Sequence, residues 1–208
     1  MKLADVTAIV SGIPHATPAQ GKIIYDSIYS NGFKSCIELG FAHGVGSSYI
    51  AAALDELGHG GRLTSIDLPF ARDRNPAAPD VIARTGLAHY VDFVFHELGY
   101  NWYLMEAIEQ QKRFDFCFLD GAHTWDVDAL AFTLVDKLLL PGGLIIFDDL
   151  DWTYAASPTM SKVEAPEQMR RTAGIRKVVE LLVKQNPSYR WLGEAQGMGA
   201  AQKIAGSP

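Results

Sequence analysis

The sequence predicts an α/β protein whose doubly wound, mostly parallel sheet carries helices on both faces. Short apolar segments alternate along the chain with longer segments in which apolar residues recur at helical spacing. Strands that are separated by helix-length connections pair in parallel, because a crossover of that length returns the chain to the same edge of the sheet. Several of the short segments are apolar throughout, as expected for strands that helices cover on both sides.

The predicted elements follow one another in a regular order. A helix over residues 18–30 precedes the first strand, and residues 1–31 are expected to form a helical cap. The predicted strands are residues 35–39, 62–66, 91–95, 114–119 and 144–147. The helices between them are residues 45–57, 79–87, 100–111 and 125–140, and a Pro-Gly-Gly sequence stops the last one. A final helix over residues 168–185 precedes a closing hairpin over residues 189–192 and 198–204.

Composition and charge limit the classes of function. The 208 residues, 48% of them hydrophobic and 20% charged, suit one globular domain over residues 1–208. A net charge of -6 without a Lys/Arg block gives no indication of a nucleic-acid partner. No segment reaches the roughly 18 uninterrupted apolar residues of a membrane span. The first residues do not resemble a signal peptide, so we expect a cytoplasmic protein that acts on a small molecule.

A glycine-rich loop joins the first predicted strand to the helix after it. The segment reads Glu38-Leu-Gly40-Phe41-Ala-His-Gly44-Val-Gly46-Ser47. Glycines let the backbone turn sharply and let a ligand come close. The start of the following helix offers free N–H groups to an anionic or carboxylate-bearing cofactor. A tight strand-to-helix turn without a ligand is the alternative interpretation.

An acidic residue at the end of the second strand supports the cofactor interpretation. Asp67 follows the glycine loop by one helix and one strand. A carboxylate at this position can bind both hydroxyls of a ribose, so we expect a cofactor with an adenosine-like group. Short-chain dehydrogenases share the spacing of Gly40, Gly44 and Gly46, but they need a tyrosine followed four residues later by a lysine. None of the eight tyrosines has a lysine at that position, so the dehydrogenase interpretation lacks its catalytic residues.

The glycine loop resembles the first motif of class I methyltransferases that depend on S-adenosylmethionine (SAM), and the resemblance covers the chain from residue 18 onward. It implies a Rossmann-like, mostly parallel seven-stranded sheet, to which the closing hairpin adds a C-terminal antiparallel strand. In this family Glu38 would lie near the methionine amino group, and the loop would carry the methionine portion of SAM. The implied SAM contacts are Glu38, Gly40, Phe41, Gly44, Gly46, Ser47, Asp67, Leu68 and Asp120.

Acidic residues follow two strands that should be neighbours in the sheet. Asp120 follows the fourth strand, and Asp148 and Asp149 follow the fifth. Three carboxylates at one rim repel one another unless a cation or protons neutralise them. Mg²⁺ or another hard divalent cation with oxygen ligands would do so. In the alternative interpretation, Asp120 and Asp149 only cap helices.

These carboxylates resemble the metal site of metal-dependent O-methyltransferases. That group includes catechol-type enzymes and the antibiotic-sugar enzymes related to macrocin methyltransferase. The Asp-Gly-Ala-His sequence at 120–123 is closer to the macrocin-like and cephalosporin-hydroxylase-like branch, because the catechol branch has lysine where His123 stands. The resemblance implies a hydroxyl oxygen as the methyl acceptor, with Asp120, Asp148 and Asp149 as metal ligands and Asp120 also as a catalytic residue.

His123 is the candidate general base. It lies three residues after Asp120 at the start of a predicted helix, so that both side chains can face one pocket. An imidazole with a pKa near neutrality can take the proton of an acceptor hydroxyl, whose own pKa a metal ion would lower. Orienting Asp120 or capping the helix is the alternative role.

Aromatic residues near this cluster are candidates for the acceptor pocket. Trp125, Trp152 and Tyr154 could form an apolar wall, although each could instead serve packing. Residues 151–175 are expected to form a lid over the active site. A homodimer through the N-terminal helix or through this lid segment is a further expectation.

Two other functions stay open at this point. One is a metal-dependent, hydroxylase-like enzyme on the same scaffold, and the other is a module that binds SAM without turnover. Formation of S-adenosylhomocysteine (SAH) from a panel of hydroxyl compounds, with and without Mg²⁺, would separate both from a methyltransferase.

Overall fold

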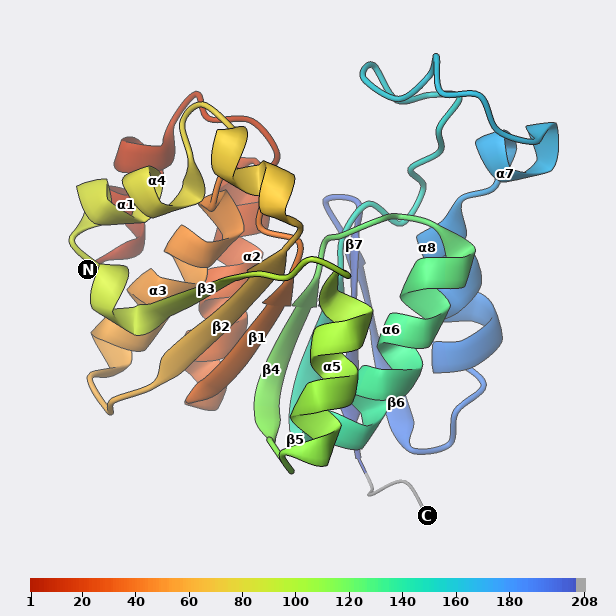
Figure 1. Cartoon of the computed structure of the whole chain (residues 1–208). Coiled ribbons are helices and arrows are strands. Elements are labelled where there is room, and N and C mark those ends of the chain that lie inside the picture. The colour runs from red at the N-terminus through yellow and green to blue at the C-terminus, as the bar shows by residue number, and fades with distance from the viewer. Residues whose placement is uncertain (205–208) are drawn as a thin grey trace.

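The protein folds into a seven-stranded sheet with helices on both faces, which confirms the predicted fold class (Figure 1). The computed structural model describes residues 1–204, so the last four residues of the predicted domain lie outside the described part. The strand order is β3-β2-β1-β4-β5-β7-β6, and among the described strands β7 alone runs opposite to the others, because it pairs antiparallel with both β5 and β6. The strands are β1 (Ser35–Leu39), β2 (Arg62–Asp67), β3 (Val91–Phe95), β4 (Phe114–Leu119), β5 (Leu139–Phe147), β6 (Tyr189–Ala195) and β7 (Met198–Lys203).

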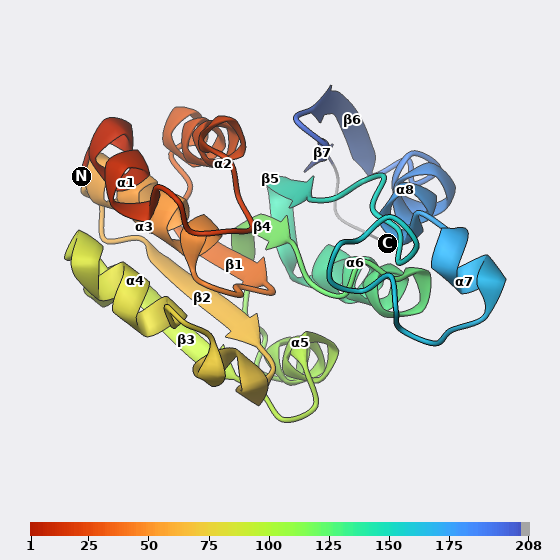
Figure 2. The same ribbon diagram turned by 90° about the horizontal axis from the view of Figure 1, so that it is seen from above.

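The helices form two layers, which are separated when the sheet is seen along its edge (Figure 2). One layer contains α1 (Leu3–Val10), α2 (Pro18–Asn31), α3 (Val45–Leu57) and α4 (Ala78–Thr85). The other contains α5 (Tyr100–Glu109), α6 (Trp125–Leu138), α8 (Gly174–Val178) and the π-helical turn η3 (Val179–Val183) that continues α8. The short elements α7 (Glu167–Arg171), η1 (Pro69–Asp73) and η2 (Ala88–Tyr90) lie in connections. Within residues 1–204, no helix is long and apolar enough to cross a membrane.

Alternate residues of the central strands pack into the two layers. Phe116 and Phe118 of β4 belong to the core formed with α1 to α4. Cys117 and Leu119 belong to the core formed with α5, α6 and α8. All four side chains are almost fully buried, which explains why β4 is apolar throughout instead of alternating with polar residues.

Several predicted helix ends were wrong by one or two residues. Helix α6 ends at Leu138, and the chain enters β5 at Leu139, whereas a helix to residue 140 and a strand from residue 144 were predicted. The residue before a proline is driven out of the helical region, so Pro141 ends the helix earlier than its own position. Helices α4 and α5 end two residues before their predicted ends, where Gly86 and Gln111 adopt left-handed backbone (φ +73° and +56°).

The predicted helix over residues 168–185 is interrupted. Helix α7 ends at Arg171, and α8 begins at Gly174 in close contact with the start of α6. A Cβ at position 174 would lie 2.6 Å from the carbonyl oxygen of His123 and 2.7 Å from the backbone nitrogen of Trp125. Only glycine allows this approach, and periodicity within one segment does not indicate such a contact. Helix α1 lies within the predicted helical cap over residues 1–31, but its bounds were not predicted; Val6 and Val10 bury its apolar face.

The ends of the strands bring the predicted site residues to one rim. Backbone hydrogen bonds extend the sheet beyond the strands: Gly40 donates to Ile66 at 2.8 Å, and Asp120 donates to Leu39 at 2.9 Å. Asp148 donates in the same way to the carbonyl oxygen of Leu119 at 3.0 Å. The backbone therefore fixes Gly40, Asp120 and Asp148 beside one another.

Candidate active site

A cavity of about 620 Å³ lies at the carboxyl ends of the central strands, and we call it the strand-end cavity. Doubly wound sheets bind ligands at this edge, where the strand order reverses, here between β1 and β4. The volume is within the range of small-molecule and cofactor sites. Seven of the residues implicated by sequence line it: Gly40, Asp67, Leu68, Asp120, His123, Asp148 and Asp149.

The glycines of the loop after β1 permit close packing. Gly40 has φ +89°, and a Cβ there would overlap the carbonyl oxygen of Asp120. Gly44 has φ +77° at the N-cap of α3, and a Cβ on Gly46 would lie 2.5 Å from Oε1 of Glu38. Of these three glycines, Gly40 lines the strand-end cavity and the other two do not.

Glu38 lies behind the loop and is not part of the cavity lining. The hydroxyls of Ser47 and Ser65 both donate hydrogen bonds to Oε2 of its carboxylate. Burial raises the pKa of Glu38 to about 7, although the two hydroxyl groups oppose this shift. Glu38 and Ser47 therefore bind each other behind the glycine loop and do not line the cavity. Their contact with SAM stays a prediction.

Asp67 ties the glycine loop to the end of β2. The backbone N–H groups of Phe41 and Ala42 donate to its Oδ2 at 3.1 and 2.9 Å. The N–H of Leu68 donates to Oδ1 at 2.7 Å. A carboxylate has about four lone-pair sites, so Asp67 can still accept bonds from a ligand in the cavity that it lines. The side chain of Phe41 packs edge-on against Phe95, with ring centroids 5.2 Å apart, and is not part of the lining.

The three predicted metal-binding aspartates converge between β4 and β5. Burial and the carboxylates of Asp148 and Asp149 raise the pKa of Asp120 well above its ordinary value. Burial and Asp149 raise the pKa of Asp148 to about 7. Asp148 is also held from α2, because Nε2 of Gln20 donates to its Oδ1 at 3.1 Å. The structure thus brings the three carboxylates together in a site where their negative charge favours protonation or a bound cation.

His123 forms a tight group with two of these aspartates. Its Nε2 lies 3.9 Å from Oδ1 of Asp120 and 3.7 Å from Oδ2 of Asp149. One ligand atom from each of the three residues lies within 4.8 Å of the others. Burial lowers the pKa of His123, with Asp149 opposing the shift, so the neutral imidazole prevails at neutral pH. His123 and Asp149 both have left-handed backbone (φ +58° and +51°), a costly conformation that clusters at functional sites.

Two buried residues hold the turn that carries His123. The hydroxyl of Tyr100 accepts the N–H of Ala122 at 3.1 Å and donates to Oδ1 of Asp128. Asp128 is completely buried, and a Cβ on Gly121 would overlap the Tyr100 ring. Sequence reasoning missed this pair, because an acidic residue in the first turn of a helix is typical of an exposed position.

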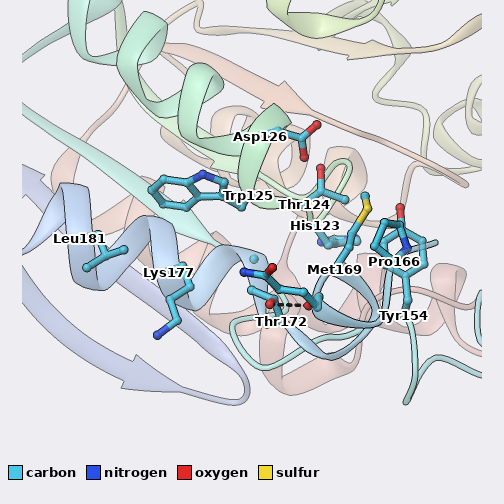
Figure 3. A pocket seen from close by; sticks show the side chains of 12 residues that line it. His123, Thr124, Trp125, Asp126, Tyr154, Pro166, Met169, Thr172, Lys177 and Leu181 are labelled. Atoms are coloured by element: carbon cyan, nitrogen blue, oxygen red, sulfur yellow. Dashed lines mark hydrogen bonds between the residues drawn. The ribbon is translucent and has the colours of Figure 1, made fainter.

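A second cavity of about 490 Å³ lies between α6, α8 and residues 151–175, and we call it the α6–α8 cavity (Figure 3). Trp125 and Tyr154, two of the three predicted acceptor-pocket residues, line it. Trp152 lines neither cavity but packs against His123 and Tyr154, with ring centroids 5.2 and 4.9 Å away. His123 is part of both linings.

Among the residues of the strand-end lining that were not predicted, three reach it from the N-terminal segment and from η1. His15 reaches it from the loop before α2, Gln20 from α2, and Arg74 from the end of η1. The ring of His15 stacks on that of His43 at 5.4 Å. The positions of these loops depend on packing between distant segments, so no local sequence pattern marks His15 or Arg74. The predicted helical cap was the one available signal for Gln20.

Comparisons with known proteins agree with this architecture. Residues 37–150 match a family model that is described as a methyltransferase domain. The O-methyltransferase from Bacillus cereus in complex with SAH is 20% identical and has a TM-score of 0.68, over 98% of this chain and 92% of that one. A putative caffeoyl-CoA O-methyltransferase from Staphylococcus aureus, also 20% identical, has a TM-score of 0.69 over the same shares.

A third similar structure is TomG, an O-methyltransferase from Streptomyces achromogenes involved in tomaymycin synthesis, in complex with SAM. It is 18% identical and has a TM-score of 0.65, over 98% of this chain and 89% of that one. At these identities the similarity establishes the fold. No curated protein matches the chain by sequence.

Proposed function

The chain belongs to the methyltransferase-domain family, whose model matches more than half of its residues, and we propose that it transfers the methyl group of SAM to a hydroxyl oxygen of a small molecule. One observation carries the proposal. His123 lines both cavities, and the acidic cluster beside it lines the strand-end cavity, so a cofactor and an acceptor in separate cavities could meet beside a base.

The residues of the strand-end cavity suit SAM. Gly40 leaves room for a ligand against the backbone, and Asp67 offers a partly free carboxylate to ribose hydroxyls. Leu68, Phe70 and Leu98 are 38%, 55% and 58% exposed and give the cavity an apolar side for a purine. Bound SAM would supply a methyl group on a positively charged sulfur, beside an acidic wall that favours a cation.

The acidic cluster suits a divalent cation. Oxygen donors of Asp120 and Asp149 lie within reach of one ion, and such carboxylates prefer Mg²⁺ or Mn²⁺. Asp148, the third predicted ligand, lines the same cavity but is not a member of this group. Burial, and after it the repulsion between neighbouring carboxylates, raises the pKa of Asp120 and Asp148, and a bound positive charge would relieve the repulsion. A bound cation would lower the pKa of an acceptor hydroxyl.

His123 is proposed as the general base. Its Nε2 faces the two carboxylates, and its imidazole is neutral at neutral pH, so it can take the proton of an acceptor hydroxyl. The acceptor oxygen forms a bond to the methyl carbon as the proton moves to Nε2 and SAH leaves. Residues 151–175 supply Tyr154 and several other residues of the α6–α8 cavity, which supports their proposed role as a lid.

The same Nε2 could instead bind the cation, and one variant separates the two roles. Asparagine tolerates the left-handed backbone at this position, so His123→Asn should fold. If His123 is the base, kcat falls by about 10²- to 10⁴-fold, and Mn²⁺ affinity measured by calorimetry changes little. A loss of Mn²⁺ affinity of about 100-fold would make His123 a ligand instead.

The test of the function is SAH formation, measured by mass spectrometry, with a panel of phenols and polyols. We expect SAH only with a suitable hydroxyl compound, and less of it when EDTA removes divalent cations. SAM binding without SAH formation from any acceptor would favour the non-catalytic module. An oxidised product without SAH would favour the hydroxylase-like alternative.

A further inference from the structure

The α6–α8 cavity meets the strand-end cavity at His123. Among the described residues, the two linings share no other member. Gly174, which lines the α6–α8 cavity, packs against the backbone of His123 and Trp125 at the start of α6. A molecule in the α6–α8 cavity can therefore present one group to His123 while its remaining atoms stay outside the strand-end cavity.

Much of the α6–α8 lining is apolar and exposed to solvent. Trp125, Met169 and Leu181 are 39%, 37% and 55% exposed, and Tyr154 and Pro166 extend the same wall. A ring system placed against them would remove their apolar surface from water. Tryptophan, tyrosine and methionine also make favourable contacts with aromatic rings, so the lining favours a flat aromatic ligand over a polyol.

One end of the cavity carries a positive charge. Lys177 lies near Leu181, away from Tyr154 and well apart from Asp126, the acidic residue of the lining (Figure 3). Its Nζ approaches Glu180 only to 3.8 Å, and the two side chains are 51% and 43% exposed. An ion pair of this kind is weak, so the ammonium group can bind an anionic group of a ligand.

The α6–α8 cavity also contains the hydroxyl of Thr124. Thr124 is 8% exposed and lines the cavity, and its Oγ1 is buried without a hydrogen-bond partner. As the N-cap of α6 it makes no side-chain cap bond. Buried hydroxyls are usually paired, so a polar substituent of a ligand would satisfy Thr124.

We propose that the α6–α8 cavity binds the body of the methyl acceptor and selects aromatic hydroxyl compounds that carry an anionic group. The acceptor hydroxyl lies at His123, the ring system packs against Trp125 and Met169, and the anionic group pairs with Lys177. Calling this ligand the acceptor rests on the proposed function, but its binding does not require turnover.

The test compares two probes by calorimetry: 6-hydroxy-2-naphthoate, which is anionic, and 2-naphthol, which is neutral. The wild-type protein should bind the naphthoate about three- to tenfold more tightly, as expected for one partly exposed charged contact. Lys177→Gln should remove this preference. Lys184→Gln is the matched control, because Lys184 follows the same helical segment, pairs with Glu194 at 3.9 Å and is not part of the lining.

A second set of measurements separates this inference from the proposed function. Both probes should bind in the presence of saturating SAH, and Trp125→Leu should weaken both. Equal affinity of the wild type for the two probes, or displacement of the naphthoate by SAH, would overturn the inference and leave SAM binding intact. Absence of SAH binding, with the naphthoate preference retained, would instead contradict the proposed function.

Discussion

The two cavities that meet at His123 are built in different ways. More than half of the strand-end lining comes from residues that end or follow β1, β2, β4 and β5, and backbone hydrogen bonds hold these strand ends together. The α6–α8 cavity is formed by helix surfaces and by residues 154–174, which pack on α6 far along the chain. A ligand site on strand ends is therefore set by the sheet, whereas the second site depends on how one irregular segment packs.

This difference bears on function. A cofactor that many related enzymes share needs the same rigid rim, and the sheet supplies it. An acceptor varies from one enzyme to another, and a wall made of loops and short helices can change without altering the sheet. Substitutions that damage one cavity and spare the other test whether the two are independent.

The largest effect is expected from Gly40→Ala. The new Cβ would overlap the carbonyl oxygen of Asp120, and φ is +89°, so the variant should lose about 3–5 kcal/mol of unfolding free energy and bind SAH poorly. Gly142→Ala is the control, because φ is +86° there and no atom lies within 4 Å of the new Cβ. It should cost about 1 kcal/mol and leave SAH binding unchanged. Equal losses in chemical denaturation would contradict the close packing of the loop on the turn after β4.

Gly174→Ala should damage the other cavity. The added Cβ would press against backbone atoms of His123 and Trp125, which cannot move without shifting the start of α6. We expect a loss of about 2–4 kcal/mol and weaker binding of 6-hydroxy-2-naphthoate. SAH affinity measured by calorimetry should change less than naphthoate affinity. A variant that loses SAH binding first would show that the two cavities are not independent.

The buried carboxyl group of Glu38, behind the glycine loop, predicts that the free energy of unfolding depends on pH. The pKa of Glu38 is about 7 in the folded protein against an ordinary value of 4.5, so the folded state holds the proton that the unfolded state releases. Stability should therefore fall as pH rises from about 5 to about 8, by on the order of 2–3 kcal/mol for this group. Glu38→Gln should show a correspondingly smaller fall in urea denaturation. An unchanged pH slope would mean that Glu38 is ionised in the fold.

The smallest effect concerns the support of the shared residue His123. Tyr100→Phe removes the hydroxyl that joins Ala122 to Asp128, and we expect a loss of about 1–2 kcal/mol together with a lower kcat. Tyr103→Phe, on the same helix, removes a hydroxyl that accepts from Lys112 at the other end of α5. That control should leave kcat unchanged. A normal kcat in Tyr100→Phe would show that the turn holds His123 without this hydroxyl.

The contrast between the cavities also explains how much the sequence could predict. The sheet, its parallel strands and the residues after β1, β2, β4 and β5 follow from apolar segments and from the rule that ligands bind at strand ends. Asp67, Asp120 and His123 were found in this way. Glu38 and Ser47 came from the same motif, but their side chains turn toward each other and not into the cavity.

The residues that the sequence did not predict depend on contacts between distant segments. His15 reaches the strand-end cavity from the loop before α2, and Arg74 reaches it from the end of η1. Met169, Lys177 and Leu181 line the α6–α8 cavity because the predicted helix over residues 168–185 breaks before Gly174. The helix breaks where Gly174 contacts the start of α6, and the periodicity of one segment does not predict a contact with a distant one.

The most direct measurement is a crystal structure of the protein with SAH, Mn²⁺ and 6-hydroxy-2-naphthoate. We expect SAH in the strand-end cavity with its ribose at Asp67, the naphthoate in the α6–α8 cavity with its carboxylate at Lys177, and the naphthol oxygen beside His123. SAH outside the strand-end cavity, or both molecules on one side of His123, would contradict this expectation.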